Sequence, residues 1–158
     1  MPDLRPLRDS DVTDVLTLND ANVVKLAPMD EVRLSELRRL ADRFDVVEVD
    51  GSFAGFVITF APGAAYDSEN YRWFAERHDS FYYLDRIVLH ERFRRRGLGR
   101  FVYDEIERVA APYRRLDLEV NLVPRNDVSL AFHAGRGYVE IGRLGEHDHV
   151  VSLMEKRL

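Results

Sequence analysis

Residues 84–100 read Leu-Asp-Arg-Ile-Val-Leu-His-Glu-Arg-Phe-Arg-Arg-Arg-Gly-Leu-Gly-Arg. The apolar run that ends in this segment predicts a central strand over 81–89, since such a strand is buried on both faces. A charged loop follows at 91–96, and the apolar positions of 98–111 recur at helical spacing. A strand, a basic turn with two glycines and a helix therefore follow one another directly, which is typical of α/β proteins.

The junction between this strand and this helix is suited to bind a diphosphate. A helix N-terminus presents unpaired N–H groups and a partial positive charge. Gly97 and Gly99 let the backbone approach a ligand closely, and the adjacent arginines add fork-shaped donors. We therefore expect an anion site at this turn.

Three kinds of phosphate loop compete for the segment. The Walker loop needs Gly-x-x-x-x-Gly-Lys-Ser/Thr, which is absent. The dinucleotide fingerprint needs a third glycine where Val102 stands, although Asp117 and Glu119 lie about where a ribose-binding acid belongs, so a nucleotide-binding oxidoreductase stays open. The coenzyme A pattern Arg/Gln-x-x-Gly-x-Gly/Ala matches 94–99 in full, and we favour it.

The rest of the chain predicts one α/β domain over residues 1–158. The Asp-Gly pair at 50–51 marks a hairpin. We expect the order β-α-α-β-β-β-α-β-α-β-β, a central mixed and mostly antiparallel sheet of about seven strands flanked by about four helices. The expected strands cover 3–7, 44–49, 53–60, 81–89, 116–122, 138–144 and 150–154, the helices cover 12–18, 32–41, 98–111 and 126–134, and the insertion at 66–80 holds a short helix at 69–77.

Composition excludes several classes of function. The chain has no cysteine, which excludes disulfides, thiolate metal sites and a cysteine nucleophile. A net charge of −5 argues against a nucleic-acid binder. No apolar signal segment or membrane-length run is visible, so we expect a cytoplasmic protein without a membrane partner. His147 and His149 hint at a metal only weakly, and we expect none.

A second pattern lies at 126–138 and reads Asn-Asp-Val-Ser-Leu-Ala-Phe-His-Ala-Gly-Arg-Gly-Tyr. Together with the loop at 94–99, it resembles the GNAT superfamily of N-acetyltransferases, whose helix after the coenzyme loop reads Asn-x-x-Ala-x-x-Phe-Tyr-x-x-x-Gly-Phe. The resemblance is motif-specific from 84 to 138, and the stretch from 66 to 86 looks like a predicted-acetyltransferase subgroup without a settled substrate. The positions that match in spacing and type are Asn126, Ser129, Phe132, Gly137 and Tyr138.

The resemblance implies an acetyl-CoA site. In that family the fourth strand splays from the fifth, the pantetheine arm lies in the gap and pairs with main-chain groups, and the pyrophosphate rests on N–H groups of the basic loop from Arg94 to Gly99. The residues so assigned to the coenzyme are Ile87, Val88, Leu89, Arg94, Arg95, Arg96, Gly97, Leu98, Gly99, Arg100, Asn126, Ser129 and Phe132.

Acetylation of an amine needs a base, because a protonated amine cannot attack a thioester. Asp85 and Glu119 are the candidates, since both are carboxylates among apolar residues and burial raises the pKa of such groups. Strand alternation places Asp85, Ile87 and Leu89 on one face. We favour Glu119 slightly, because it shares with Asn121 the polar face of its strand.

His133 is the candidate acid that donates a proton to the departing thiolate. The family often has a tyrosine directly after the phenylalanine, and this chain has His133 there. A protonated histidine is a stronger acid than tyrosine but is only partly charged at pH 7. Three alternatives stay open: His133 acts as the acid, it holds the thiolate by a hydrogen bond, or no side chain acts as the acid.

The insertion is expected to lie near the acceptor, with 66–79 as a lid. We expect an enzyme that moves an acetyl group to the primary amine of a small molecule by direct attack in a ternary complex. The alternative is a non-catalytic acyl-CoA-binding or regulatory module, and exposed hairpin edges leave a homodimer open. The residues expected around the acceptor are Asn19, Asn22, Tyr66, Asn70, Tyr71, Trp73, Phe74 and Asn121.

Overall fold

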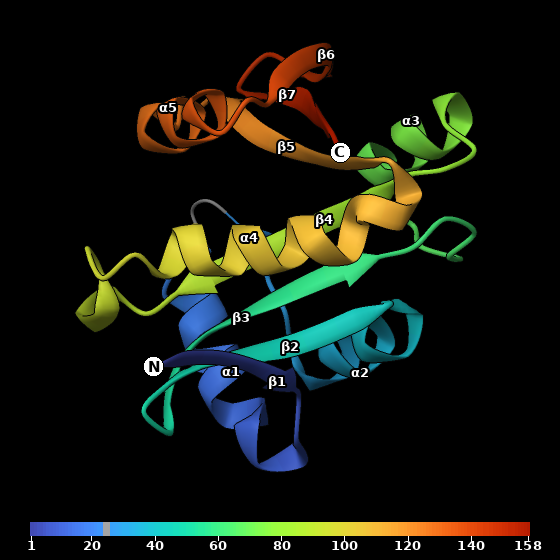
Figure 1. Ribbon diagram of the computed structural model, residues 1–158. Helices are drawn as coiled ribbons and strands as arrows, with labels where there is room; N and C mark the ends of the chain where they lie inside the picture. The colour runs from blue at the N-terminus through green and yellow to red at the C-terminus, as the bar shows by residue number, and fades with distance from the viewer. Residues whose placement is uncertain (24–25) are drawn as a thin grey trace.

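The computed structural model describes residues 1–23 and 26–158, which form a seven-stranded sheet with five α-helices (Figure 1). The strand order is β1-β2-β3-β4-β5-β7-β6. The strands are β1 (Pro2–Pro6), β2 (Arg43–Val49), β3 (Ser52–Phe60), β4 (Tyr82–Leu89), β5 (Arg115–Val123), β6 (Val139–Glu146) and β7 (His149–Arg157). The helices are α1 (Val12–Asp20), α2 (Glu31–Leu40), α3 (Glu69–Arg77), α4 (Leu98–Ala110) and α5 (Asp127–Gly135).

The predicted fold class and order of elements are confirmed. Of the strand pairings, β4 with β5 is parallel and the others are antiparallel. The fifth helix is α3, the short helix expected within the insertion. No helix among the described residues is long and apolar enough to cross a membrane.

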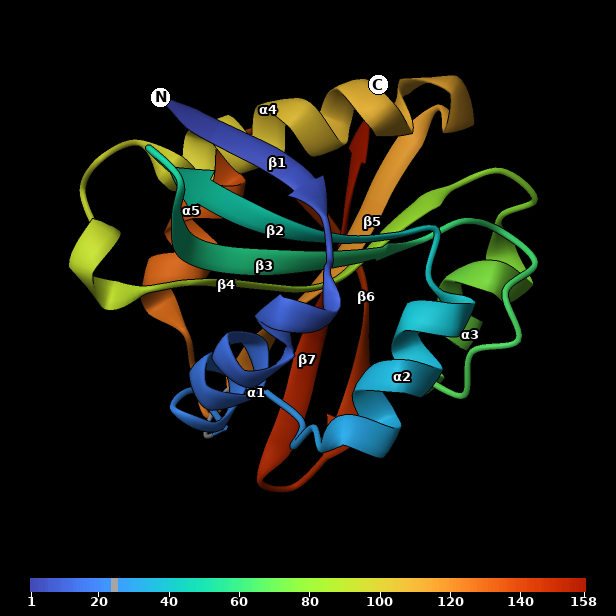
Figure 2. The same cartoon turned by 90° about the horizontal axis from the view of Figure 1, so that it is seen from below.

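The helices lie in two layers, one on each face of the sheet. Helices α1, α2 and α3 cover one face, and α4 and α5 cover the other (Figure 2). Helix α4 shows why: Leu98, Val102, Ile106 and Ala110 recur every four residues and are all buried against the sheet. Each face of the sheet thus has its own hydrophobic core.

Strands β4 and β5 are paired only where they begin. Tyr82 pairs with Leu116 and Tyr83 with Asp117, and beyond these positions the strands separate. In Figure 1 they meet on the right and diverge toward the left. The main chain of β4 from 84 to 89 therefore has no strand partner on its β5 side.

A β-bulge interrupts the pairing of β4 with β3. Thr59 pairs with Leu84 and Ile58 with Arg86, so Asp85 is one extra residue between them. A bulge of this kind changes which side chains share a face. Such bulges occur often beside active sites, where they re-aim a side chain.

This bulge overturns the expected alternation along β4. Leu84, Ile87 and Leu89 pack in the core beneath α4, although alternation from Leu84 would separate it from the other two. The Asp85 carboxylate instead meets Tyr66 and Arg86 on the opposite side. The prediction that Asp85 shares a face with Ile87 and Leu89 is therefore wrong.

Candidate active site

A cavity of about 800 Å³ opens where β4 and β5 diverge. Its walls come from β4 (84–89) and β5 (118–121), and α4 and α5 contribute Tyr103, Ser129 and His133. The loop between α1 and α2 and the start of the insertion close the opposite side. Segments that are distant in sequence thus meet around one space large enough for a ligand.

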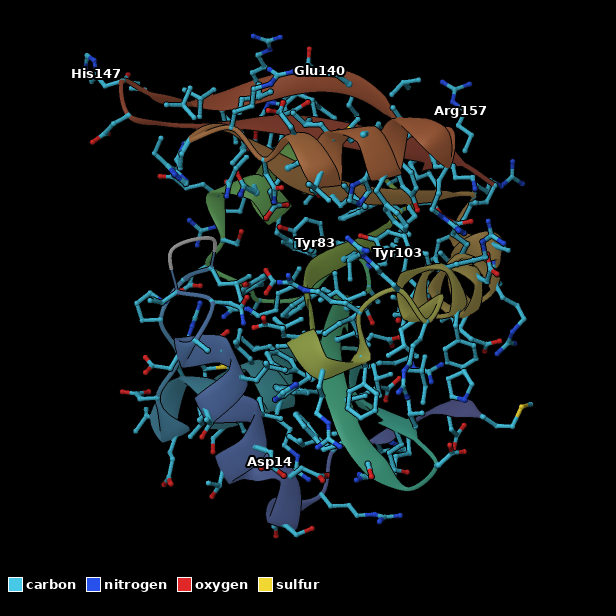
Figure 3. The ribbon with its side chains drawn as sticks, turned by 90° about the vertical axis from the view of Figure 1, so that its left-hand side faces the viewer. Asp14, Tyr83, Tyr103, Glu140, His147 and Arg157 are labelled. Atoms are coloured by element: carbon cyan, nitrogen blue, oxygen red, sulfur yellow. The ribbon has the colours of Figure 1, made fainter. Side chains whose placement is uncertain are left out.

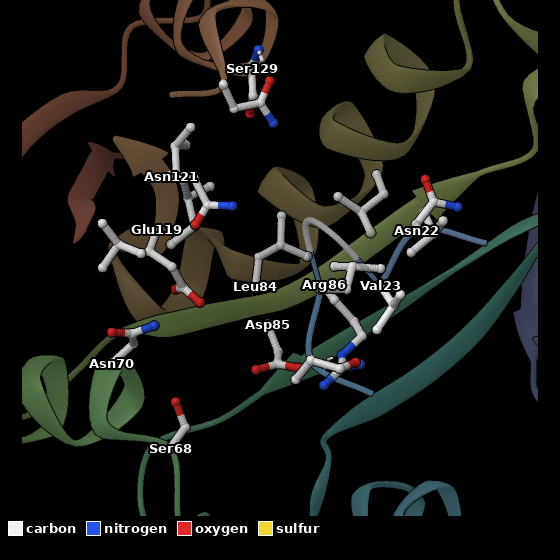
Figure 4. Close-up of a pocket in the computed structure, with 18 of the residues that line it drawn as sticks. Asn22, Val23, Ser68, Asn70, Leu84, Asp85, Arg86, Glu119, Asn121 and Ser129 are labelled. Carbon is white, nitrogen blue, oxygen red and sulfur yellow. Dashed lines mark hydrogen bonds and ion pairs between the residues drawn. The ribbon is translucent and has the colours of Figure 1, made fainter. Parts of the chain in front are cut away.

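Glu119 lies in this cavity, held by a tyrosine. The Tyr83 hydroxyl donates to the two carboxylate oxygens of Glu119 at 2.9 and 2.7 Å. Burial, with a contribution from the Asp85 charge, raises the pKa of Glu119 to about 8, while donation from Tyr83 and Asn70 acts in the opposite direction. Figure 3 shows Tyr83 near the middle of the molecule, and in Figure 4 Glu119 points toward Asn70.

Asp85, the other candidate base, has both carboxylate oxygens engaged. Oδ1 accepts from the Tyr66 hydroxyl at 2.6 Å, and Oδ2 accepts from Arg86 Nε at 3.1 Å. One of these donors is the charged Arg86 guanidinium, whereas Glu119 accepts from the uncharged Tyr83 hydroxyl. The contacts therefore favour Glu119 as the base.

Sequence reasoning missed Arg86, which organises one wall of the cavity. Its Nη1 donates to Asn19 Oδ1 at 3.0 Å and to the Ala27 carbonyl at 3.1 Å. Asn19 is buried and also donates to Ala27 at 3.1 Å. Asn19 thus supports the loop between α1 and α2 from behind, whereas Asn22 of that loop lines the cavity.

Both ring nitrogens of His133 are engaged. Nδ1 lies 2.7 Å from the Ser129 carbonyl, which can only accept, so Nδ1 carries the hydrogen. Nε2 then accepts from the Tyr103 hydroxyl at 2.6 Å. Burial lowers the pKa of His133, so the ring is neutral at pH 7 and presents no free N–H to the cavity.

The basic loop has the backbone expected of an anion site. Gly97, with φ of 74°, precedes α4, and the first helical bond runs from the Phe101 N–H to the Gly97 carbonyl. The N–H groups at 98–100 therefore have no partner within the helix. The N–H of Arg94, by contrast, donates to the Glu91 carbonyl at 3.1 Å, so the expectation that it holds phosphate conflicts with this turn.

Helix α5 packs against the first turn of α4, which follows this loop. A Cβ added to Gly99 would meet two ring carbons of Phe132 at 3.6 Å. Asn126 caps α5 by accepting from the Ser129 N–H at 3.2 Å, and both residues line the cavity. The cap and the free edge of β4 line the cavity, and the loop at 94–99 lies outside that lining but leads into α4, whose Tyr103 belongs to it. This arrangement fits a ligand that has a diphosphate at one end and amides along its length.

The sequence model of the Acetyltransferase (GNAT) family matches residues 11–138. The chain belongs to this family. As a GNAT protein it is an acyltransferase that uses acetyl-CoA. The search of curated proteins found no match.

Solved structures share the whole fold. Ard1 from Thermoplasma volcanium is 19% identical with a TM-score of 0.77, and 99% of this chain and 97% of that chain are covered. Arabidopsis thaliana NAA60, solved with a bisubstrate analogue, is 15% identical with a TM-score of 0.75 and coverages of 99% and 98%. The ribosomal-protein-S18-alanine N-acetyltransferase from Escherichia coli is 17% identical with a TM-score of 0.70 and coverages of 99% and 94%.

Apart from Asn19, which lies behind the cavity wall, the expected acceptor residues of this GNAT protein fall into two groups. Asn22, Tyr66, Asn70 and Asn121 line the cavity, and the lining from the insertion ends at Asn70. The other group consists of the aromatic residues of α3, which lie outside the cavity lining.

Tyr71 and Phe74 are fully buried in the core beneath α3. Trp73 packs against Gly142, and the Arg77 guanidinium stacks over its ring at 3.8 Å. The expectation that these three aromatic residues contact the acceptor is not supported by their packing. They anchor α3, because an amphipathic helix turns its large apolar side chains toward the core.

A buried cluster of His78, Asp117 and Glu155 has the spacing of metal ligands. Arg115 already brings a positive charge there: its Nη1 lies 3.2 Å from Glu155 Oε2 and 3.1 Å from His78 Nδ1. Within the described residues the Asp117 carboxylate has no hydrogen-bond partner. The cluster does not belong to the cavity lining.

Proposed function

We propose that this enzyme transfers the acetyl group of acetyl-CoA to the primary amine of a small molecule, by direct attack of the amine within a ternary complex. The observation that carries the proposal is the Glu119 carboxyl, which lies in the cavity between β4 and β5 with a pKa of about 8. The chain has no cysteine to form an acyl-enzyme, which favours direct attack.

Glu119 is matched to the proton transfer that the reaction needs. An alkylammonium with a pKa near that of lysine is neutral in only about one molecule in a thousand at pH 7. A carboxyl group with a pKa of about 8 is ionised in about one molecule in ten at that pH. Because it is more basic than an ordinary glutamate, it accepts the proton of an ammonium ion more readily.

The environment of His133 favours release of the thiolate without a side-chain acid. The neutral ring donates to Ser129 and accepts from Tyr103, so it holds no proton to give. A coenzyme thiolate leaves reasonably well unaided. Tyr103 and His133 then shape the wall of the cavity.

The amine proposal is tested by coenzyme A release across a library of small amines. Release with a subset of small amines, lost in Glu119→Gln, is the expected result. Retained acetyl-CoA binding without turnover on any amine would instead support the second candidate, a non-catalytic acyl-CoA-binding module. That candidate is favoured by one observation, the histidine at the position of the family tyrosine.

The coenzyme loop is tested by Gly97→Glu, with Gly51→Glu as a matched control. Both glycines have positive φ, of 74° and 80°, and neither has an atom within 4 Å of an added Cβ. The two variants therefore carry similar backbone strain, and only the first places a carboxylate at the proposed phosphate site. We expect about tenfold or greater loss of acetyl-CoA affinity in Gly97→Glu alone. Equal affinities in the two variants would contradict the proposed loop.

A further inference from the structure

The arginines that line the acceptor side of the cavity are already paired with carboxylates. Arg33 of α2 donates through Nη2 to Asp67 Oδ1 at 2.9 Å and through Nη1 to Glu36. Arg86 forms an ion pair with Asp85 at 3.1 Å. Neither guanidinium is therefore free to neutralise a negative charge on an acceptor.

Carboxylates outnumber arginines in this lining. Asp67 and Asp85 pair with the two arginines, Glu119 adds a third carboxyl group, and His133 and His149 are the remaining basic side chains among the described lining residues. Lys25 lies outside the described residues. An anionic group placed beside the amine would lose hydration and meet like charges, which disfavours it.

Uncharged hydrogen-bonding groups also line the cavity. Asn22, Asn70 and Asn121 contribute their amides, and Ser68 adds a hydroxyl. Figure 4 shows Asn70 and Ser68 on the side of Asp85, with Ser129 on the opposite side. An amide both donates and accepts, so these side chains suit hydroxyl or amide groups of a ligand.

We infer that the acceptor is an amine whose neighbouring groups are uncharged hydroxyl or amide groups, and that amines bearing a phosphate or carboxylate are rejected. The inference rests on the proposed function and specifies its substrate class. Recognition follows from the amide side chains, and rejection follows from the paired arginines. The aminosugars and amino alcohols are the simplest members of this class.

Matched pairs of amines test the inference. Glucosamine against glucosamine 6-phosphate, and ethanolamine against O-phosphoethanolamine, keep the amine and add only the anion. We expect kcat/KM for coenzyme A release to be at least about tenfold higher for the uncharged member of a pair. A preference for the phosphorylated member, or equal values, would overturn the inference alone, whereas release with no amine of the library would overturn the proposed function as well.

Asp67→Asn sharpens this test because it removes one of the two carboxylate partners of Arg33 and leaves Glu36 as the other. The less fully neutralised guanidinium should favour the phosphorylated amines, so the preference for uncharged amines should fall by about fivefold. Asp9→Asn is the control, since Asp9 forms a comparable exposed pair with Arg38 of the same helix at 2.8 Å, outside the cavity lining. A preference that is the same in both variants would overturn the assignment of rejection to the pairing of Arg33.

Discussion

Asp117, which is buried, and Glu119, which is half-buried, are acids on the same face of β5, two residues apart, and they lie in different surroundings. Burial raises the pKa of both above the ordinary carboxyl range. Glu119 faces the cavity and has Tyr83 as a donor, whereas Asp117 is sealed beneath α3 beside Glu155 and has no hydrogen-bond partner within the described residues.

The difference shows that a raised pKa does not by itself mark a catalytic group. Structural clusters perturb carboxyl groups as strongly as active sites do. What separates the two residues is access, because Glu119 lines the cavity and Asp117 does not.

Replacing each acid by its amide gives the largest contrast. We expect Glu119→Gln to lower turnover by about a hundredfold or more, the usual contribution of a general base. The deficit should shrink as the pH falls below about 8, because the wild-type carboxyl group is then protonated and no longer acts as a base. Acetyl-CoA affinity measured by calorimetry should stay within about twofold of wild type. Asp117→Asn is the matched control, and a comparable loss of turnover in it would contradict the comparison.

Asp117→Asn should act on stability instead. The folded pKa of Asp117 is raised above its unfolded value, so the folded state binds more protons and the wild type loses stability as the pH rises from about 4 to the folded pKa. The variant has no carboxyl group to ionise at this position, so it does not lose this stability. It should be more stable than the wild type by about 2 kcal/mol at the upper end of that range. Urea denaturation at several pH values measures the free energy of unfolding of both proteins. An equal dependence on pH in both proteins would show that Asp117 is not a buried neutral acid.

Much of this arrangement could be predicted from the sequence. The turn at 94–99 and all strands follow from local patterns, since apolar periodicity, Asp-Gly and Gly-x-Gly each carry their own backbone geometry. Glu119 could be proposed as the base because alternation along β5 is regular from Leu116 to Val120.

The remaining features depend on contacts between distant segments. The bulge at Asp85 arises from the pairing of β4 with β3, so alternation along β4 alone gave the wrong face. Arg86 meets Asn19 across 67 positions of sequence, and Tyr83 meets Glu119 across 36. Such partners have no signal in a local pattern. Tyr71 could have been placed in the core, since α3 is amphipathic and its apolar face needs a partner.

Tyr83→Phe weakens the difference between the two acids. Removing the donor to Glu119 takes away stabilisation of the charged carboxylate, so the pKa of Glu119 should rise further. Turnover at pH 7 should fall by about three- to tenfold and recover at higher pH. The pH profile of kcat measures the shift, and a uniform loss at every pH would indicate that Tyr83 only supports the packing.

Asp85→Asn should shift the pH profile of kcat in the opposite direction to Tyr83→Phe, by a smaller amount. The negative charge of Asp85 contributes to the raised pKa of Glu119, so its removal should lower that pKa and move the rising limb of the kcat profile to lower pH. Arg86 keeps its bonds to Asn19 and Ala27 in this variant, which preserves the wall of the cavity. We expect the ratio of turnover at pH 6 to maximal turnover to be about two- to threefold higher in this variant than in the wild type. If Asp85 were itself the base, turnover would instead collapse at every pH, and the assignment of proton transfer to Glu119 would be wrong.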